Sequence, residues 1–425
     1  YTEPYVRWCE RSKFLNFEKF LLLDLIFIKN KKYLGNSYIF CELYICMRCP
    51  RCLNEDPAYF YKGVHGYYCR KCISFSRICI EDTFESVSLD LPGNNSEEYV
   101  LKYPLTEKQK TISTQCKEKI EETDILIHAV TGAGKTELVV ETIAKMLKEK
   151  KKVCFAIARR QVVLELAGRF KEIFPKAKVI AVCGGHTSVL DGDLIVCTTH
   201  QLFRYYNAFD LLILDEPDAF PFYGNDVLHG IASTACTKHH IYLTATPDDI
   251  LLKMVKMGKL YVLNLDSRPH GKPIPVPKVY TGFLIGRMIC LLYWIKKYKN
   301  TPRMIFVPTI AMAKQMTFFL TLFLHVYMCT SKTENRDEVI EKFRNDSDGI
   351  CICTTVLERG VTIPNVNVCI YEANHSVFNE AALIQMAGRA GRNFLHPEGD
   401  VLFITSKKTE IVQDCIDEIE RANRA

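Results

Sequence analysis

The sequence has no uninterrupted apolar stretch of the roughly 20 residues that a membrane-spanning helix needs. Residues 315–331 form an uncharged run of 17 that includes several threonines, and we expect a buried helix followed by a short strand. Residues 14–28 are apolar but include Glu18, Lys19 and Asp24, which indicates an amphipathic helix. A membrane-associated interaction protein built on that helix is an alternative, although such a stretch usually packs on a core.

Glycine and proline, 21 and 17 residues, are too few for a low-complexity or collagen-like chain. Hydrophobic residues make up 48%, which is enough to offset chain entropy and excludes a mainly disordered protein. The 19 cysteines fall below the roughly 8–10% of a disulfide scaffold. They lie in apolar runs, which indicates buried thiols in a reducing compartment. The first ten residues do not predict a signal peptide, and we expect a cytoplasmic protein.

The charge balance favours an anionic partner without proving one, because 55 Lys and Arg face 49 Asp and Glu, a net charge of +6. The length of 425 residues predicts two or three domains. The sequence does not indicate an oligomeric state.

From about residue 105 onward, short apolar runs alternate with helical patterns, which is typical of buried parallel strands in an α/β fold. Three prolines within residues 273–277 exclude a helix or a central strand there and predict a stiff linker. The first series of runs is 125–130, 153–157, 179–182, 194–197, 211–214 and 241–243, and the second is 304–307, 349–354, 366–371 and 400–405. We predict an N-terminal segment of unknown role (1–45), a cysteine module (46–80), a linker (81–104), a first α/β domain (105–266), a Pro-rich linker (267–280) and a second α/β domain (281–425).

Residues 129–136, Ala-Val-Thr-Gly-Ala-Gly-Lys-Thr, lie between a predicted strand and a helical pattern. In this context the backbone N–H groups and the helix N-terminus point at phosphate oxygens. Lys135 would neutralise the β- and γ-phosphates, and the Thr136 hydroxyl would ligate Mg²⁺. A glycine-rich turn with a surface lysine is the alternative, and Ala129 departs from the general pattern, which has Gly. The loop residues expected to hold the nucleotide are Thr131, Gly132, Gly134, Lys135 and Thr136.

The apolar run 211–214 ends in two carboxylates, Asp215 and Glu216. Ligands bind open α/β sheets at the C-terminal ends of the strands, which would place both acids beside the phosphate loop. Asp215 would hold Mg²⁺, and Glu216 would orient or deprotonate the attacking water. Taken alone, such a pair also suits a solvated strand end or a helix cap.

Residues 385–392, Gln-Met-Ala-Gly-Arg-Ala-Gly-Arg, place Arg389 and Arg392 three residues apart, which predicts one shared helical face. An arginine delivered from a separate domain can stabilise charge on a transferring phosphate. Gln385, Arg389 and Arg392 are therefore catalytic candidates, and a basic surface patch is the alternative.

Cysteine pairs at Cys49 and Cys52 and at Cys69 and Cys72 are separated by 16 residues. Four thiolates at this spacing suit a tetrahedral, structural Zn²⁺ with no open position. Cys46 makes a competing pair with Cys49, so the choice of ligands stays open.

The cysteine module is basic and aromatic, with six Lys or Arg against two acids over residues 46–80. This mixture suits single-stranded DNA, through phosphate attraction and base stacking. Alternatively, the aromatic rings form the small core around zinc. The interleaved rings are Tyr59, Phe60, Tyr61, Tyr67 and Tyr68.

These features together resemble the superfamily 2 helicases over about residues 105–425. Residues 105–109 are similar to the Q-type motif, in which Gln109 would read adenine. Residues 244–247 are similar to the motif that couples hydrolysis to motion, and 306–309 and 354–362 to second-domain motifs. The resemblance implies two tandem RecA-like domains with parallel sheets, which bind ATP and Mg²⁺ between them.

More closely, residues 46–425 resemble the ComFA family of late-competence, helicase-like proteins of Gram-positive bacteria. Pro217 stands where that family usually has Val. Residues 158–161 replace a usual Pro-Arg-x-Asp, so only Arg159 is carried over, and residues 1–45 match no known pattern. The resemblance rests on the four-cysteine module and on residues 128–136, 198–202, 215–221, 357–362 and 372–375.

The resemblance implies a motor on single-stranded DNA that enters during natural transformation, at the inner face of the cell membrane, with membrane-associated DNA-uptake and other competence proteins as partners. A PriA-like replication-restart helicase is an alternative, although that family carries its zinc-binding insertion within the motor. A nucleic-acid clamp gated by ATP, which binds without moving, is another. Each residue implied to contact the strand also suits a cap or turn. These residues are Arg159, Thr198, His200, Thr246, Thr309, Thr354 and Arg359.

Overall fold

The computed structural model describes residues 47–81, 87, 89–90, 98–357, 363–393 and 396–424. The chain divides into two compact units, Tyr1–Thr83 and Phe84–Ala425, and each is described by itself. The predicted segment 1–45, its amphipathic helix, Cys46 and Arg359 lie outside the described residues.

The described part of the first unit is built on an antiparallel hairpin of β1 (Phe60–Gly63) and β2 (Gly66–Cys69). Gly66 has a φ of +110°, a conformation that favours glycine in a tight turn. Short 3₁₀ turns precede and follow the hairpin at Pro57–Tyr59 and Ile73–Phe75. Cys69 ends β2 and Cys72 directly precedes the second 3₁₀ turn, whereas Cys49 and Cys52 lie in a separate turn before the first.

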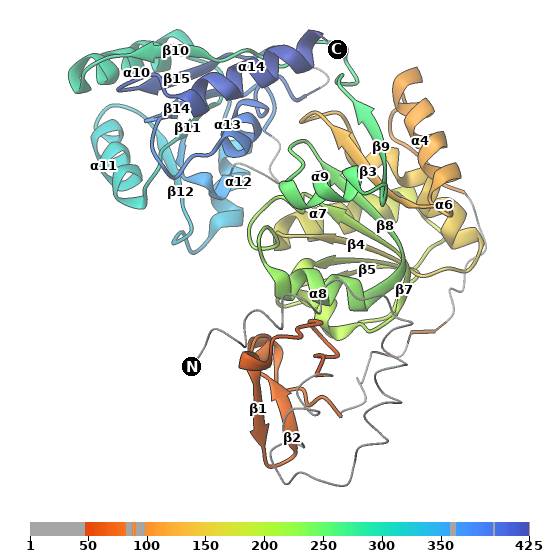
Figure 1. Ribbon diagram of the computed structural model, residues 1–425. Helices are drawn as coiled ribbons and strands as arrows, with labels where there is room; N and C mark the ends of the chain where they lie inside the picture. The colour runs from red at the N-terminus through yellow and green to blue at the C-terminus, as the bar shows by residue number, and fades with distance from the viewer. Residues whose placement is uncertain are drawn as a thin grey trace, which may run out of the picture. The chain divides into compact units, whose positions relative to one another are not determined.

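The second unit contains a seven-stranded and a six-stranded sheet, and all neighbouring strands in both are parallel (Figure 1). The two predicted parallel α/β domains are therefore confirmed. In spatial order, the first sheet is β5 (Val179–Val182), β6 (Leu194–Thr198), β4 (Val153–Ile157), β7 (Phe209–Asp215), β8 (Cys236–Thr244), β3 (Asp124–Ala129) and β9 (Leu260–Leu265). The second is β10 (Lys278–Thr281), β15 (Val401–Thr405), β14 (Asn367–Tyr371), β11 (Arg303–Phe306), β13 (Ile350–Cys353) and β12 (Val326–Cys329).

Helices cover both faces of each sheet. Ile125 and Ile127 of β3 pack in the core with α4, α6 and α7, whereas Leu126 points the other way and packs with Leu251 of α9. In the second sheet, Met304 packs with α12, α13 and α14, and its neighbour Ile305 packs with α10 and α11. The helices are α4 (Glu107–Lys119), α5 (Lys135–Leu138), α6 (Val140–Lys148), α7 (Arg160–Ile173), α8 (Asp226–Ala235), α9 (Asp249–Lys256), α10 (Leu284–Lys297), α11 (Ile310–Thr321), α12 (Arg336–Arg344), α13 (Glu380–Ala387) and α14 (Glu410–Arg424).

Each of the apolar runs predicted as a strand is a strand, because strands covered on both faces consist almost entirely of buried residues. β9 and β10 were missed, and both lie at the edge of a sheet. β10 begins at Lys278, inside the predicted linker 267–280, and pairs with β15. The segment between the two sheets is therefore shorter than predicted.

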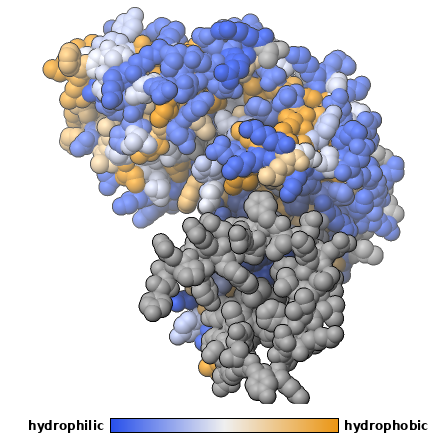
Figure 2. Space-filling model, viewed as in Figure 1, coloured by the Kyte–Doolittle hydropathy of each residue, from blue (hydrophilic) through white to orange (hydrophobic). Residues whose placement is uncertain are grey.

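Residues 315–331 contain the end of α11 and the whole of β12, as the sequence predicted. The helix is not fully buried, however, since Phe318 and Phe319 of α11 are exposed. Figure 2 shows hydrophobic residues gathered on the surface over α10 and α11. None of the helices in the described residues has the length and apolar composition needed to cross a bilayer.

Candidate functional site

The phosphate loop follows β3, which ends at Ala129, and leads into α5, which begins at Lys135. Gly132 and Gly134 both have a φ of +81°, in the region where side chains are strained. A Cβ on Gly134 would lie 2.8 Å from Nε2 of Gln109. The backbone path predicted from the glycine spacing is therefore present, with the helix N-terminus behind it.

Lys135 points back onto this loop, with Nζ donating a hydrogen bond to the Ala129 carbonyl at 2.7 Å. Burial lowers the pKa of Lys135 to about 8, while the carboxylates of Glu216 and Asp215 act against this shift. The lysine and the two acids, about 80 residues apart in sequence, therefore lie close enough to interact.

Asp215 ends β7, and the Glu216 N–H donates to the Leu243 carbonyl of the neighbouring strand at 2.8 Å. Glu216 has a φ of +53°, so the chain turns sharply after the acids. This geometry supports the predicted position of Asp215 and Glu216 beside the phosphate loop, at the C-terminal ends of the strands.

Asp218 was not singled out from the sequence, yet it connects two motifs. Its carboxylate accepts hydrogen bonds from the hydroxyls of Thr244 at 2.5 Å and Thr246 at 2.7 Å. Thr246, predicted to contact nucleic acid, is thus held by the segment that carries the predicted catalytic acids. The signal available in the sequence was the position of Asp218, two residues after Glu216.

Arg392 lines a small cavity of about 100 Å³ together with Thr136, Asp215 and Glu216. The prediction that Arg389 and Arg392 share a helical face is wrong, because α13 ends at Ala387 and both arginines follow it. Arg389 is only 4% exposed and does not line the cavity. Gln385 is also buried, and its Nε2 has no hydrogen-bond partner among the described residues.

Gln109 closes a capping box at the start of α4, in which its Oε1 accepts a hydrogen bond from the Thr106 N–H at 3.0 Å. Its Nε2 donates to the Ala133 carbonyl in the phosphate loop at 2.8 Å. Gln109 also lines a cavity of about 590 Å³ with Tyr103, Gly134 and other residues. The expected adenine reader therefore lies against the phosphate loop, with both ends of its amide already hydrogen-bonded.

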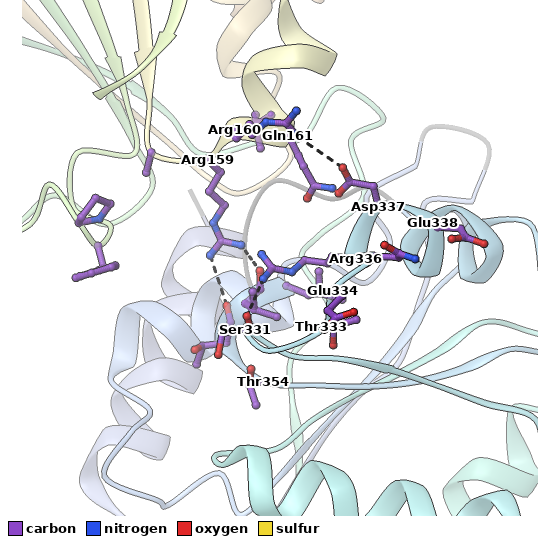
Figure 3. Close-up of a pocket in the computed structure, with 18 of the residues that line it drawn as sticks. Arg159, Arg160, Gln161, Ser331, Thr333, Glu334, Arg336, Asp337, Glu338 and Thr354 are labelled. Atoms are coloured by element: carbon purple, nitrogen blue, oxygen red, sulfur yellow. Dashed lines mark hydrogen bonds and ion pairs between the residues drawn. The ribbon is translucent and has the colours of Figure 1, made fainter. Parts of the chain in front are cut away.

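A larger cavity of about 1000 Å³ is lined by residues that follow strands of both sheets (Figure 3). We call this cavity the groove. Arg159, His200 and Thr354, three of the predicted strand contacts, lie in it. Arg159 extends from the first domain and donates hydrogen bonds to the carbonyls of Thr355 and Val356 in the second. Burial lowers the pKa of His200, which favours its neutral form.

The other predicted strand contacts that the structure describes lie elsewhere. Thr198 is buried at the end of β6, and Thr309 caps α11 by accepting a hydrogen bond from the Met312 N–H at 3.1 Å. Sequence reasoning missed Phe220, which lines the groove and is 90% exposed. Its signal was an aromatic residue four positions after Glu216.

The four cysteines of the first unit meet at one point, with all Sγ atoms within 4.8 Å of one another. The Cys49–Cys72 and Cys52–Cys69 sulfurs are 3.7 and 3.8 Å apart. Zn–S bonds of about 2.3 Å in a tetrahedron place sulfurs about 3.8 Å apart, so this set fits Zn²⁺. Hydrogen bonding with Cys52 lowers the pKa of the Cys49 thiol to about 7.

The tyrosines of this module are not its core. Among the five interleaved rings only Phe60 is buried, while Tyr59 and Tyr61 are 41% and 56% exposed. Cations lie over four rings: Arg77 over Tyr68 at 4.5 Å, Lys71 over Tyr59 at 5.4 Å, Arg70 over Tyr61 at 5.7 Å and Lys62 over Tyr67 at 5.9 Å.

Comparisons with known proteins agree with this architecture. Residues 102–249 match the family model described as type III restriction enzyme, res subunit, and residues 286–394 match the helicase conserved C-terminal domain. The fold resembles that of S. cerevisiae Dbp5 bound to RNA and ADP BeF3, with a TM-score of 0.56 and 16% identity over 75% of this chain and 92% of that one. This likeness shows the fold alone, two RecA-like domains.

Two relatives are more similar in sequence. The competence protein ComFA of Streptococcus pneumoniae is 35% identical over 89% of this chain and 90% of the relative. The competence protein ComFA of Bacillus subtilis is 32% identical over 92% and 90%. A helicase with these two domains implies the binding of ATP and Mg²⁺. Because the identity extends over nearly the whole of each protein, the chain belongs to the ComFA family of competence proteins, which are helicase-type enzymes of superfamily 2.

Proposed function

We propose that this protein is an ATP-dependent single-stranded DNA translocase that drives DNA uptake in natural transformation. The observation that supports this most is the groove, because its walls come from both RecA-like domains and Arg159 spans them. A strand held across both domains experiences any change in their separation. Hydroxyl, imidazole and guanidinium groups hydrogen-bond phosphates without reading sequence.

ATP hydrolysis in this proposal uses residues from both domains. Lys135 neutralises the phosphates, Thr136 and Asp215 hold Mg²⁺, and Glu216 orients the attacking water. Arg392 approaches from the second domain and stabilises the charge that develops on the transferring phosphate. Closing on ATP and opening after hydrolysis would move the domains, and with them the bound strand.

Asp218 supports a route from the catalytic acids to the strand. Its carboxylate holds Thr244 and Thr246 by hydrogen bonds, and it lies between Glu216 and the groove residue Phe220 in sequence. A shift of the acids on hydrolysis would therefore displace both the threonine motif and the wall of the groove.

Phe220 provides a surface for base stacking in the groove. An exposed aromatic ring beside Arg159 and His200 offers a π-face to a base while the guanidinium and the imidazole hold the backbone. Every base has such a face, so the contact tolerates any sequence. This arrangement favours a single strand, whose bases are free to stack on protein.

We infer that the four cysteines hold a structural Zn²⁺ that stabilises the first unit, because four thiolates leave no open coordination position. The exposed tyrosines and their cations then form a second surface suited to single-stranded DNA. We also propose that the protein works at the inner face of the cell membrane with membrane-associated DNA-uptake and other competence proteins, as its family relationship suggests.

Steady-state phosphate release tests the proposed activity. The rate is measured at low salt with no nucleic acid, single-stranded DNA, duplex DNA and single-stranded RNA side by side. We expect stimulation by single-stranded DNA above the other three, and loss of that stimulation as salt rises, because phosphate contacts release counterions. Equal or greater stimulation by RNA, or none by any nucleic acid, would contradict the proposal.

Displacement of a protein block from labelled single-stranded DNA separates a translocase from a clamp. We expect displacement that requires ATP hydrolysis and fails with a non-hydrolysable analogue. Stimulated ATPase without displacement would identify the clamp instead.

A further inference from the structure

Arg268 is a buried cation in the segment that leaves the first domain. It is 3% exposed and follows β9, which ends at Leu265. Arg268 lies within the predicted linker 267–280. In the part of the chain that the structure describes, the hydrogen bonds of its guanidinium all go to main-chain carbonyls. A guanidinium removed from water needs such partners, since an unpaired buried charge is strongly unfavourable.

These carbonyls belong to two segments that are far apart in sequence. Nε donates to Thr131 in the phosphate loop at 2.9 Å. Nη1 donates to Ala390 at 3.0 Å and Gly391 at 2.8 Å, and Nη2 donates to Gly388 at 3.0 Å. Gly388, Ala390 and Gly391 belong to the turn after α13, and Arg392 is the next residue. The planar fork of Arg268 therefore joins the phosphate loop to the turn that carries Arg392.

The contact between this turn and the phosphate loop is close enough to need glycine. A Cβ on Gly388 would lie 2.1 Å from Oγ1 of Thr131. A Cβ on Gly132 would lie 3.3 Å from Cγ of Arg392 and 3.4 Å from Nε of Arg268. The turn and the loop thus pack directly on each other, the backbone of each against a side chain of the other, with Arg268 beside the point of contact.

Three cations surround the phosphate loop here. Burial, with a contribution from Arg392, lowers the pKa of Arg268 to about 10, and Arg392 also acts to lower the pKa of Lys135. Arg392 is therefore held near two like charges, which repel it. Hydrogen bonds from Arg268 to the turn oppose this repulsion, because they attach the turn to the loop.

We propose that Arg268 is a positioning residue that fixes the turn of residues 388–391 on the phosphate loop, so that Arg392 faces Asp215 and Glu216. The inference rests on the proposed hydrolysis between the two domains. Arg268 also lies in the segment that joins the two domains. The rate of ATP hydrolysis therefore depends on the position of that segment. It touches no nucleotide in this role and acts only through Arg392.

A purely structural role predicts a different result. Loss of a buried side chain lowers stability and affects nucleotide binding and turnover together. A positioning role affects kcat, because the loop residues Lys135 and Thr136 that bind nucleotide belong to the first domain and stay in place. The distinction is measured as KM for ATP against kcat, with a labelled ATP analogue reporting binding directly.

The main variant is Arg268→Lys, which keeps the charge but replaces the fork by a single point donor. Gly388→Ala disturbs the same contact from the opposite side. We expect kcat of the basal ATPase to fall about tenfold to a hundredfold in both, as for a misplaced catalytic group. In Arg268→Lys, KM and analogue affinity should stay near wild type. Only kcat is compared for Gly388→Ala, because its Cβ would also press on Thr131.

Arg303→Lys is the matched control, because Arg303 is 2% exposed and donates to Ile295 and Asp348 within the second domain; its kcat should be unchanged. The melting temperature should fall to a similar extent in Arg268→Lys and in the control, because both replacements remove hydrogen bonds from a buried guanidinium.

A double-mutant cycle tests whether Arg268 acts through Arg392. If it does, Arg268→Lys lowers kcat in the wild-type background but has little further effect in Arg392→Ala. Additive losses, an unchanged kcat in Arg268→Lys, or a parallel loss of nucleotide binding would each overturn the inference. These outcomes are separate from failure of the proposed function, in which the wild-type protein itself would show no ATPase or no response to single-stranded DNA.

Discussion

Arg159 of the first RecA-like domain donates a hydrogen bond to the main-chain carbonyl of Val356 in the second. The contact lies in the groove, beside His200 and Thr354, and is separate from the contact of Arg268 with the turn after α13. The two domains are therefore joined by arginine side chains at both the proposed strand path and the proposed nucleotide site. Both arginines donate to main-chain carbonyls. These contacts therefore depend on the backbone geometry of the facing domain and not on the identity of its side chains.

Replacement of Arg159 by Ala should weaken single-stranded DNA binding about tenfold to a hundredfold, because a charge-assisted contact contributes roughly 1.5–3 kcal/mol. Basal ATPase should persist, since Arg159 does not line the cavity with Asp215 and Glu216. Fluorescence anisotropy of a labelled oligonucleotide measures the affinity. Arg344→Ala, at an exposed position on α12, serves as the control. Equal affinity of the Arg159 and Arg344 variants would exclude Arg159 from the strand path.

Replacement of Phe220 by Ala should also lower single-stranded DNA affinity, by about 1–3 kcal/mol for one stacked base. Phe220→Tyr should retain affinity, because the ring is kept. The slope of affinity against salt should not change, since no phosphate contact is lost. Stability should be unaffected, because the side chain is 90% exposed. An Ala variant with wild-type affinity would mean that no base stacks there.

Replacement of Lys135 by Ala should abolish ATP turnover. The remaining loop can still offer N–H groups, but the charge that neutralises the phosphates is gone. Phosphate release is the measurement. Lys148→Ala is the control, because Lys148 is an exposed lysine at the end of the helix that follows α5. Turnover at the wild-type rate in the Lys135 variant would refute the nucleotide site.

The four-cysteine site should contain one Zn²⁺ per chain, measured by elemental analysis of purified protein. Cys69→Ser should reduce the zinc content and lower stability, because binding free energy of a structural zinc is folding free energy. Cys290→Ser should change neither, since Cys290 lies on α10 and outside the cluster. Full zinc content in the Cys69 variant would point to another ligand, and Cys46 is the candidate to test next.

The central strands were predictable because their local pattern is strong. β4 and β6 are buried along their whole length, so their residues are apolar except for Thr198 at the end of β6. Edge strands have only part of their residues buried, and β9 and β10 alternate or expose polar positions. Their pairing with a sheet, rather than their own composition, makes them strands.

The sequence by itself determined the phosphate loop, the two acids and the four-cysteine cluster. Each of these depends on residue types at short fixed spacings, and short spacing translates directly into geometry. Only the tertiary structure decided that Arg392 faces the acids while Arg389 is buried, that Asp218 holds Thr246, and that Arg268 joins the loop to the turn. The contact of Arg268 with Thr131 alone joins residues 137 positions apart, and such pairs meet only when the sheets and their connections are in place.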